Sequence, residues 1–304
     1  MAACIIGAVS LLRRPGRRDD VFGGEPPIFV HGISRAGGTL VTTILDAHPQ
    51  VAMSYELYPQ LLEGADADAL TRRFGKASSV RSAAGKLEPD AKTFFLRAER
   101  SGLEPGEIAG ALRGGDLSSA KGRVTFVARL ARAKMRKLGK SRWGVKCGSD
   151  YDDYVALWPG ALFVGLLRDG RDVLASQQKT GSFDRDPAHI ADAWAEDVAR
   201  FQALLDDPSV HALQVRYEEL VADPEPQIAR LASFVGVDLD PKMLRHHEEA
   251  LTVFDAHHLS MDRITLPIDA SQVGRWTRDV SRDDLDVFWS HAGRAMEAAG
   301  YAAG

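Results

Sequence analysis

The chain has 304 residues, of which 45% are hydrophobic and 26% charged, and its formal net charge is −4. These fractions are ordinary for a globular protein, and we expect no nucleic-acid partner. Its two cysteines, Cys4 and Cys147, exclude a disulfide framework, and the absence of a Cys-x-x-Cys pair argues against a zinc site. A reducing compartment such as the cytoplasm is the simplest fit.

The N-terminal segment, residues 1–24, combines the apolar stretch Ala2–Leu12 with four arginines that follow it. A stretch of eleven residues is too short to cross a bilayer, which needs about 20. A signal peptide would place its positive charges before the apolar stretch, not after it. We expect a short helix that packs on the protein; the alternative is peripheral membrane contact, with the arginines among anionic headgroups.

Strands and helices alternate along most of the remaining chain, residues 25–304, which predicts one α/β domain with a mostly parallel sheet flanked by helices. Near-continuous apolar runs, typical of strands covered on both faces, occur at Pro27–Gly32, Arg142–Lys146, Ala161–Arg168 and His211–Glu218. Helices are expected at Thr39–Ala47, Gly170–Gln178, Pro187–Leu205, Glu225–Val235, Pro241–Glu249 and Arg282–Ala299, with Gly300 as the last helix stop.

The segment Ala65–Lys140 interrupts this alternation, because it has a helical composition and no obvious core strand. It predicts a helical insertion. The insertion carries 17 Lys and Arg against 8 Asp and Glu, a balance of +9, whereas the rest of the chain has a balance of −13. One interpretation is a solvated helical face; the other is a basic wall that faces an acidic or otherwise anionic substrate.

The first predicted strand runs into "GISRAGGT" (Gly32–Thr39), a glycine-rich turn that opens a helix. Backbone N–H groups and the dipole at a helix N-terminus bind phosphate or sulfate. Gly37 and Gly38 allow close backbone approach, and Arg35 offers a planar guanidinium. The pattern GxxxxGK[ST] requires a lysine where Gly38 stands, so we expect no metal-and-lysine apparatus of the kind that nucleotide triphosphatases use. A tight structural turn is the alternative.

A second anion pocket is predicted where the apolar run "ALFVGLLR" ends at Arg168. Ligands gather at the carboxyl ends of parallel strands, and the following helix carries Ser176 two turns further on. Arg168 and Ser176 are therefore placed to hold a second phosphate. The alternative is that Asp169, Arg171 and Asp172 only form a salt-bridged helix start.

Together the two motifs resemble those of sulfotransferases that use 3′-phosphoadenosine 5′-phosphosulfate (PAPS), where a "PRSGTTLL"-like loop binds the 5′-phosphosulfate and an "RDGRDVxxS" segment the 3′-phosphate. The resemblance continues in family order through "WGVKCGSD" (143–150), "VRYEELVADP" (215–224) and "VGRWTRD" (273–279). It covers about two thirds of the chain and leaves the insertion unmatched. It implies a P-loop-like three-layer fold and a donor site made of Arg35, Ala36, Gly37, Gly38, Thr39, Arg168, Ser176, Tyr217 and Arg275.

One departure concerns the donor loop: the family's "RSGTT" is "RAGGT" here, so Ala36 and Gly38 each lack a hydroxyl. Backbone N–H groups and the hydroxyl of Thr39 remain. The departure bears on donor affinity and leaves the expected fold unchanged.

Sulfuryl transfer to a hydroxyl needs a base for the acceptor proton and positive charge on the group that moves and the phosphate that leaves. Protein-tyrosine sulfotransferases show "DAHP" followed by a "GEE" turn, and this resemblance places Glu56 on the base; His31 and His48 are the alternatives. Lys146 resembles the family's K-x-P lysine and would act with Arg35 on the leaving oxygen.

The resemblance thus implies an enzyme that transfers a sulfuryl group from PAPS to a hydroxyl of a tyrosine peptide, a glycan, a lipid or a small alcohol or phenol. Two other functions stay open at this point: a nucleotide-dependent phosphotransferase of the kinase type, and a non-catalytic module that binds adenosine bisphosphate. The sequence makes no prediction of oligomeric state.

Overall fold

The computed structural model describes residues 25–147, 151–158, 160–180, 186–249 and 261–303. The predictions for the N-terminal segment and for Cys4 lie outside these residues. Among the helices that the structure describes, none is long and apolar enough to cross a membrane.

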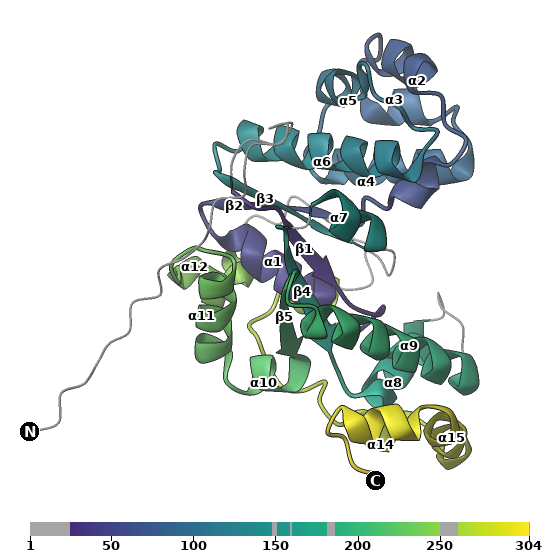
Figure 1. The fold of residues 1–304 in the computed structure, drawn as a ribbon, viewed down its shortest axis with the longest axis vertical. Helices are drawn as coiled ribbons and strands as arrows, with labels where there is room; N and C mark the ends of the chain where they lie inside the picture. Colours follow the sequence, from purple (N-terminus) through teal and green to yellow (C-terminus); the bar gives the residue numbers. More distant parts are fainter. Residues whose placement is uncertain (1–24, 148–150, 159, 181–185, 250–260, 304) are drawn as a thin grey trace, which may run out of the picture.

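A five-stranded parallel sheet forms the centre of the molecule (Figure 1), with the strand order β2-β3-β1-β4-β5. The strand β1 lies in the middle, because it pairs with β3 on one side and β4 on the other. The strands are β1 (Ile28–His31), β2 (Val51–Tyr55), β3 (Arg142–Lys146), β4 (Leu162–Leu167) and β5 (His211–Arg216). The expected α/β fold with a parallel sheet is confirmed.

Four of these strands were predicted from the sequence, and the edge strand β2 was not. Its sequence, VAMSY, contains Ala, Met and Ser, so it lacks the run of β-branched and aromatic residues that indicates a strand. All five residues are nevertheless buried, because α1 (Gly38–Ala47) and α6 (Ala120–Lys137) pack on β2. Tertiary packing therefore decides the conformation of this segment.

Alternate residues of the strands supply two hydrophobic cores on opposite faces of the sheet. On β1, Phe29 belongs to the core that contains the insertion helices and α7 (Asp152–Leu157), whereas Ile28 and Val30 belong to the core built with α1 and α11 (Pro224–Phe234). Successive side chains of a strand point to opposite faces, so the sheet becomes the middle layer of three.

Helices of the second half of the chain complete these layers, and α8, α9 and α15 share a third cluster around Trp194 and Phe288. The predicted helix Pro241–Glu249 was wrong in extent, since the α-helix ends at Leu244 and a 3₁₀ turn follows Arg245. The helices are α8 (Gly170–Thr180), α9 (Pro187–Asp206), α10 (Tyr217–Ala222), α12 (Pro241–Leu244), η2 (His246–Glu248), α13 (Met261–Ile264), α14 (Trp276–Asp279) and α15 (Arg282–Ala298).

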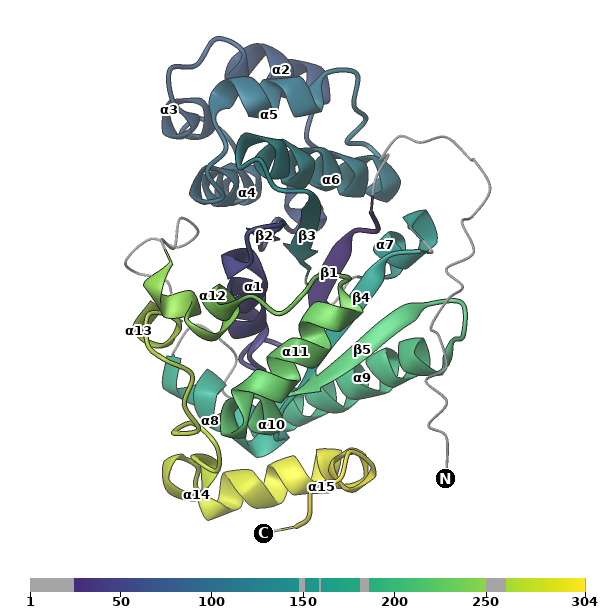
Figure 2. The same ribbon diagram turned by 90° about the vertical axis from the view of Figure 1, so that its left-hand side faces the viewer.

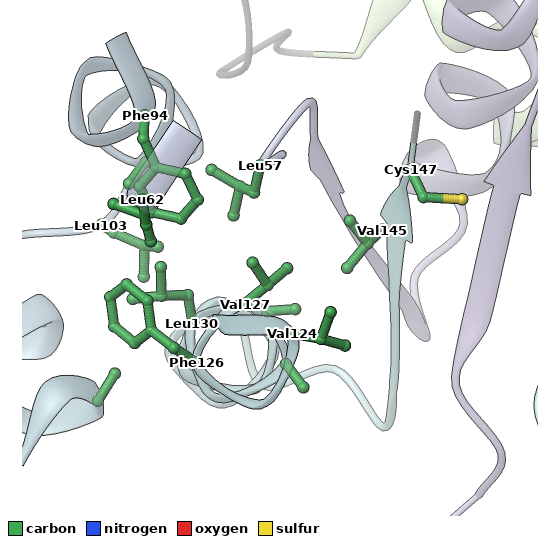
Figure 3. Packing of buried hydrophobic residues seen from close by; sticks show 14 of the residues in the cluster. Leu57, Leu62, Phe94, Leu103, Val124, Phe126, Val127, Leu130, Val145 and Cys147 are labelled. Atoms are coloured by element: carbon green, nitrogen blue, oxygen red, sulfur yellow. The ribbon is translucent and has the colours of Figure 1, made fainter. Parts of the chain in front are cut away.

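Between β2 and β3 the chain forms only helices: η1 (Pro59–Leu62), α2 (Ala67–Phe74), α3 (Val80–Ala84), α4 (Pro89–Arg100), α5 (Pro105–Leu112) and α6. The helix α6 joins this group to the sheet, whereas α2, α3 and α5 lie farther out (Figure 2). Val124 and Val127 of α6 face Val145 of β3 (Figure 3), and Phe126 of α6 lies 5.9 Å from the ring of Phe94 in α4.

Many basic side chains of this helical segment are engaged in contacts within the fold. Lys134 is buried, forms an ion pair with Asp46 at 3.2 Å and donates to the carbonyl of Met53. Lys137 pairs with two glutamates of the same segment, Glu104 and Glu107. The excess of positive charge is therefore only in part a surface property.

Candidate functional site

A cleft of about 870 Å³ opens at the carboxyl ends of the central strands, where ligands of parallel α/β sheets bind. Eleven residues were predicted to form a site. The cleft brings nine of them together: Arg35, Gly37, Gly38, Thr39, Glu56, Lys146, Arg168, Ser176 and Tyr217. The other two, Ala36 and Arg275, are buried and do not line the cleft.

The loop after β1 is a tight turn with two residues in the left-handed region, Arg35 at φ 79° and Gly37 at φ 106°. The N–H of Ala36 donates to the carbonyl of Ile33 at 3.0 Å and closes the turn. A Cβ on Gly37 would lie 2.7 Å from Cδ2 of Tyr217, so only glycine allows this ring to approach. The turn directs the N-terminus of α1, with N–H groups that have no intrahelical partner, into the cleft.

The two predicted anion pockets are in direct contact. The Nε of Arg35 donates to the hydroxyl of Ser176 at 2.9 Å, and Nη1 of Arg168 donates to the carbonyl of Arg35 at 2.9 Å. The guanidinium of Arg168 also lies over the ring of Tyr217, 4.4 Å from its centre. The pockets therefore form one continuous basic surface rather than two separate ones.

This basic surface is partly desolvated. Burial lowers the pKa of Arg35, and the positive charges of Arg168 and Arg275 lower it further. The Nε of Arg168 is buried and has no hydrogen-bond partner among the residues that the structure describes. Buried guanidinium groups that repel one another favour the binding of an anion.

Behind Arg168, the fully buried carboxylate of Asp172 accepts the N–H groups of Gly274 and Trp276 at 2.9 and 3.0 Å, and lies 3.9 Å from the Arg168 guanidinium. Burial raises the pKa of this carboxyl group. Arg275 donates to the carboxylate of Asp279 and to the side chain of Gln272, a cleft residue. Arg275 thus supports the wall of the cleft from behind.

The predicted salt-bridged helix start exists beside the anion pocket. Arg171 pairs with Asp169 at 2.8 Å, and its guanidinium stacks 4.1 Å from the ring centre of Trp276. Arg168 lines the cleft beside this ion pair, and its role in holding a phosphate stays a prediction.

The opposite end of the cleft contains Glu56 and Lys146. Tyr55 of β2 is paired with Lys146 of β3, so the residue after Tyr55 lies beside the lysine. The Nζ of Lys146 is 2.7 Å from Oε1 of Glu56 and 3.2 Å from Oγ1 of Thr39. The lysine therefore connects the candidate base to the first turn of α1.

Glu56 has φ 53°, and with Arg35 it is one of two non-glycine residues with positive φ in the part of the chain that the structure describes. Such a conformation costs about 1–3 kcal/mol and persists only where surrounding contacts hold it. Both strained residues line the cleft, as expected of a functional site.

The alternative bases are located elsewhere. His31 is buried, with Nε2 2.8 Å from a carboxylate oxygen of Asp197 and its ring against Tyr151. His48 follows the last residue of α1, at the amino-terminal edge of the sheet, where it contacts the carbonyl of Asp238. Neither histidine lines the cleft.

Several cleft residues were not predicted. Arg97 and Arg100, near the end of α4, are the two basic residues of the insertion that line the cleft. The interpretation of the insertion as a basic wall that faces an anionic substrate stays a prediction. Tyr58, two residues after Glu56, also lines the cleft. Residues of the segment 263–272 form a further wall of the cleft, which includes Arg263 and the apolar side chains of Ile264, Leu266, Pro267 and Ile268.

The structure contains no cluster of three His, Cys, Asp or Glu residues suited to a metal ion within the ranges that it describes.

The chain is similar to known sulfotransferases. A model of the sulfotransferase family matches residues 125–241, which include Lys146, Arg168, Ser176 and Tyr217. Protein-tyrosine sulfotransferase A of Caenorhabditis elegans is 26% identical over 286 residues, 89% of this chain and 67% of that protein. The protein-tyrosine sulfotransferase of Drosophila melanogaster is 24% identical over 277 residues, 86% of this chain and 50% of that protein.

Two solved structures share the fold. The sulfotransferase domain from the curacin biosynthetic pathway has a TM-score of 0.58 at 17% identity, over 92% of this chain and 99% of that one. The sulfotransferase domain from the Synechococcus PCC 7002 olefin synthase has a TM-score of 0.56 at 19% identity, over 92% and 98% of the two chains. The chain is thus similar to the sulfotransferase family model over residues 125–241, and to curated protein-tyrosine sulfotransferases over most of its length.

Proposed function

We propose that the protein transfers a sulfuryl group from PAPS to a hydroxyl acceptor, without a metal ion. The contact that joins Arg35, Ser176 and Arg168 is the observation that carries this proposal. Residues 133 and 141 positions apart meet in one cleft, and their arrangement suits a ligand with two anionic ends. An adenosine with a 3′-phosphate and a 5′-phosphosulfate has this character.

The residues present fit such a donor. The buried Nε of Arg168 lacks a partner among the described residues, and the ring of Tyr217 lies against Gly37, so the two motifs meet over a glycine backbone. We assign the phosphosulfate end to the loop after β1 and the 3′-phosphate to the end of β4. The residues proposed to bind the phosphosulfate are Arg35, Ala36, Gly37, Gly38 and Thr39. Those proposed to bind the 3′-phosphate are Arg168, Ser176 and Tyr217. Arg275 supports this second group through Gln272.

When bound, the donor supplies an activated sulfuryl group with a good leaving group. In our proposal Glu56 takes the proton of the acceptor hydroxyl, which requires the carboxylate form that Lys146 stabilises at 2.7 Å. Lys146 and Arg35 place positive charge where negative charge develops on the leaving oxygen. Thr39 orients Lys146 through the contact at 3.2 Å.

The acceptor that we propose is a hydroxyl, with a tyrosine peptide as the first candidate because the curated relatives are named protein-tyrosine sulfotransferases. Arg100 of the insertion lines the cleft and favours an acceptor with neighbouring negative charge. A cytoplasmic location and peripheral membrane contact through residues 1–24 stay predictions.

Incubation of the purified protein with ³⁵S-labelled PAPS and a panel of tyrosine peptides, glycans, lipids and phenols tests the proposal. We expect label to move to at least one class of acceptor without added metal. Transfer of phosphate from ATP with Mg²⁺ would favour the phosphotransferase instead. Binding of adenosine bisphosphate without transfer at high protein concentration would favour the non-catalytic module.

A further inference from the structure

We propose that Arg97, supplied by the helical insertion, is a positioning residue for Glu56. This inference rests on the proposed function, in which Glu56 is the base. The insertion resembles none of the family motifs. This role would make its helix α4 a direct part of the site.

Arg97 contacts Glu56 at two points. Its Nη1 donates to the backbone carbonyl of Glu56 at 3.0 Å, and its Nη2 lies 3.9 Å from the carboxylate oxygen Oε2. The guanidinium also lies over the ring of Tyr58, 4.9 Å from its centre. One side chain therefore engages the backbone and the carboxylate of the base as well as the residue two positions later.

The backbone of Glu56 requires such support. Its φ of 53° is a left-handed conformation that a non-glycine residue keeps only when its surroundings hold it. The strand β2 ends at Tyr55, so the sheet ladder no longer fixes the next residue. Arg97 bonds the carbonyl of Glu56, and Lys146 bonds the other carboxylate oxygen, Oε1.

The charged and titratable groups around Glu56 come from four elements. Lys146 belongs to β3, Arg97 to α4, Arg35 to the loop after β1, and the Tyr58 hydroxyl to the turn itself. Among them, Arg97 donates directly to the backbone carbonyl of Glu56.

The helix that carries Arg97 is rigidly anchored. Phe94, Phe95 and Ala98 of α4 are fully buried, and the ring of Phe95 packs 4.4 Å from that of Phe74. A residue that positions a catalytic group is effective when its own element is fixed by packing. The aromatic core of the insertion therefore supports the Arg97 contact.

The test compares Arg97→Met with wild type in two measurements. Turnover should fall by on the order of 10²-fold while the acceptor KM and the bisphosphate affinity change by less than about threefold, because the base is displaced and not removed. Backbone hydrogen exchange of residues 55–58 should become faster. In an Arg97→Ala variant, added guanidinium ions should restore part of the turnover.

The same helix offers two control substitutions to methionine, one of a lysine and one of an arginine. Lys92 is exposed and does not line the cleft, so Lys92→Met should match wild type in both measurements. Arg100 lines the cleft, and Arg100→Met should leave the exchange of residues 55–58 unchanged.

The outcomes separate this inference from the proposed function. If wild type transfers no sulfate, the proposed function fails, whereas the exchange measurement still decides whether Arg97 holds the Glu56 turn. The inference is overturned if residues 55–58 of the Arg97→Met variant exchange their backbone hydrogens at the wild-type rate. It is also overturned if the loss of activity lies entirely in the acceptor KM. Should Arg97→Met fail to fold, Arg97→Lys retains the charge without the fork and is expected to show the same faster exchange.

Discussion

The ammonium group of Lys146 lies 2.7 Å from a carboxylate oxygen of Glu56, across the carboxyl ends of two neighbouring strands. Both side chains are mostly buried, with 15% and 21% of their surfaces exposed. The same ammonium group lies 3.2 Å from the hydroxyl of Thr39, in the first turn of α1. The pair therefore places the candidate base at a fixed position relative to the anion-binding loop. Substitutions can separate proton transfer by Glu56 from nucleotide binding by the loop.

Replacement of Glu56 by glutamine removes the proton acceptor and keeps the size of the side chain. We expect Glu56→Gln to lower kcat by about 10²-fold or more, which is a typical contribution of general base catalysis. Binding of adenosine 3′,5′-bisphosphate should stay within a few-fold of wild type, because the donor residues are unchanged. Steady-state kinetics and calorimetry on the same preparation measure both quantities.

Glu63→Gln is the matched control, since the Glu63 side chain is 77% exposed and lies outside the cleft. It should keep wild-type turnover. Full activity of Glu56→Gln would exclude Glu56 as the base and direct the search to other cleft residues.

Gly37 is the second position where the structure makes a sharp prediction. Its φ of 106° and the ring of Tyr217, 2.7 Å from the position of an added Cβ, both oppose any side chain. Gly37→Ala should weaken bisphosphate binding by about tenfold or more and lower the Tm, because the loop and the ring must both move. Calorimetry and thermal unfolding provide the measurements.

The control for Gly37 is Gly110, an exposed glycine inside α5 with open space around it. Gly110→Ala should keep the binding affinity and raise stability slightly, since alanine is favoured over glycine in a helix interior by about 0.5–1 kcal/mol. Equal effects of the two substitutions would show that the Gly37 turn is not specifically required.

Stability should depend on pH through His246, whose ring is fully buried in η2. Burial, with a smaller effect of the neighbouring His247, lowers the pKa of His246 from 6.5 to about 4. The unfolded chain then binds a proton that the native protein excludes, so the free energy of unfolding decreases as the pH falls from about 6.5 to about 4. At pH 5 the loss relative to pH 7 amounts to about 2 kcal/mol.

His246→Leu removes the titrating ring, whose nitrogens have no hydrogen-bond partner among the described residues. Urea unfolding measures the free energy of unfolding of wild type and His246→Leu at pH 5 and pH 7. Between pH 7 and pH 5 the variant should lose less of this free energy than wild type. A difference that stays constant between the two pH values would contradict this account.

The loop at Arg35 and the strand end at Arg168 were predictable because each depends on local patterns. A glycine-rich turn after an apolar run indicates where backbone N–H groups gather, and the last residue of a buried strand in a parallel sheet faces the ligand edge. The bonds of Arg35 to Arg168 and to Ser176 were not predictable, since they depend on how two distant segments pack.

The edge strand β2 and the role of α4 required the structure. The segment VAMSY is a strand because α1 and α6 cover it, and its own residues only weakly favour that conformation. Arg97 lies 41 residues from Glu56 in a segment without a recognisable motif. For Arg275, the neighbouring glycine and tryptophan do not reveal the direction of the side chain, which the Asp279 carboxylate one helical turn later determines.

The most direct test of the account is calorimetric titration of the protein with adenosine 3′,5′-bisphosphate, in parallel with the 3′- and the 5′-monophosphate. If Arg35 and Arg168 hold opposite ends of one ligand, the bisphosphate should bind at least about tenfold more tightly than either monophosphate. Arg168→Ala should reduce its affinity to that of the 5′-monophosphate. Absence of binding, or equal affinities for all three nucleotides, would contradict the central claim.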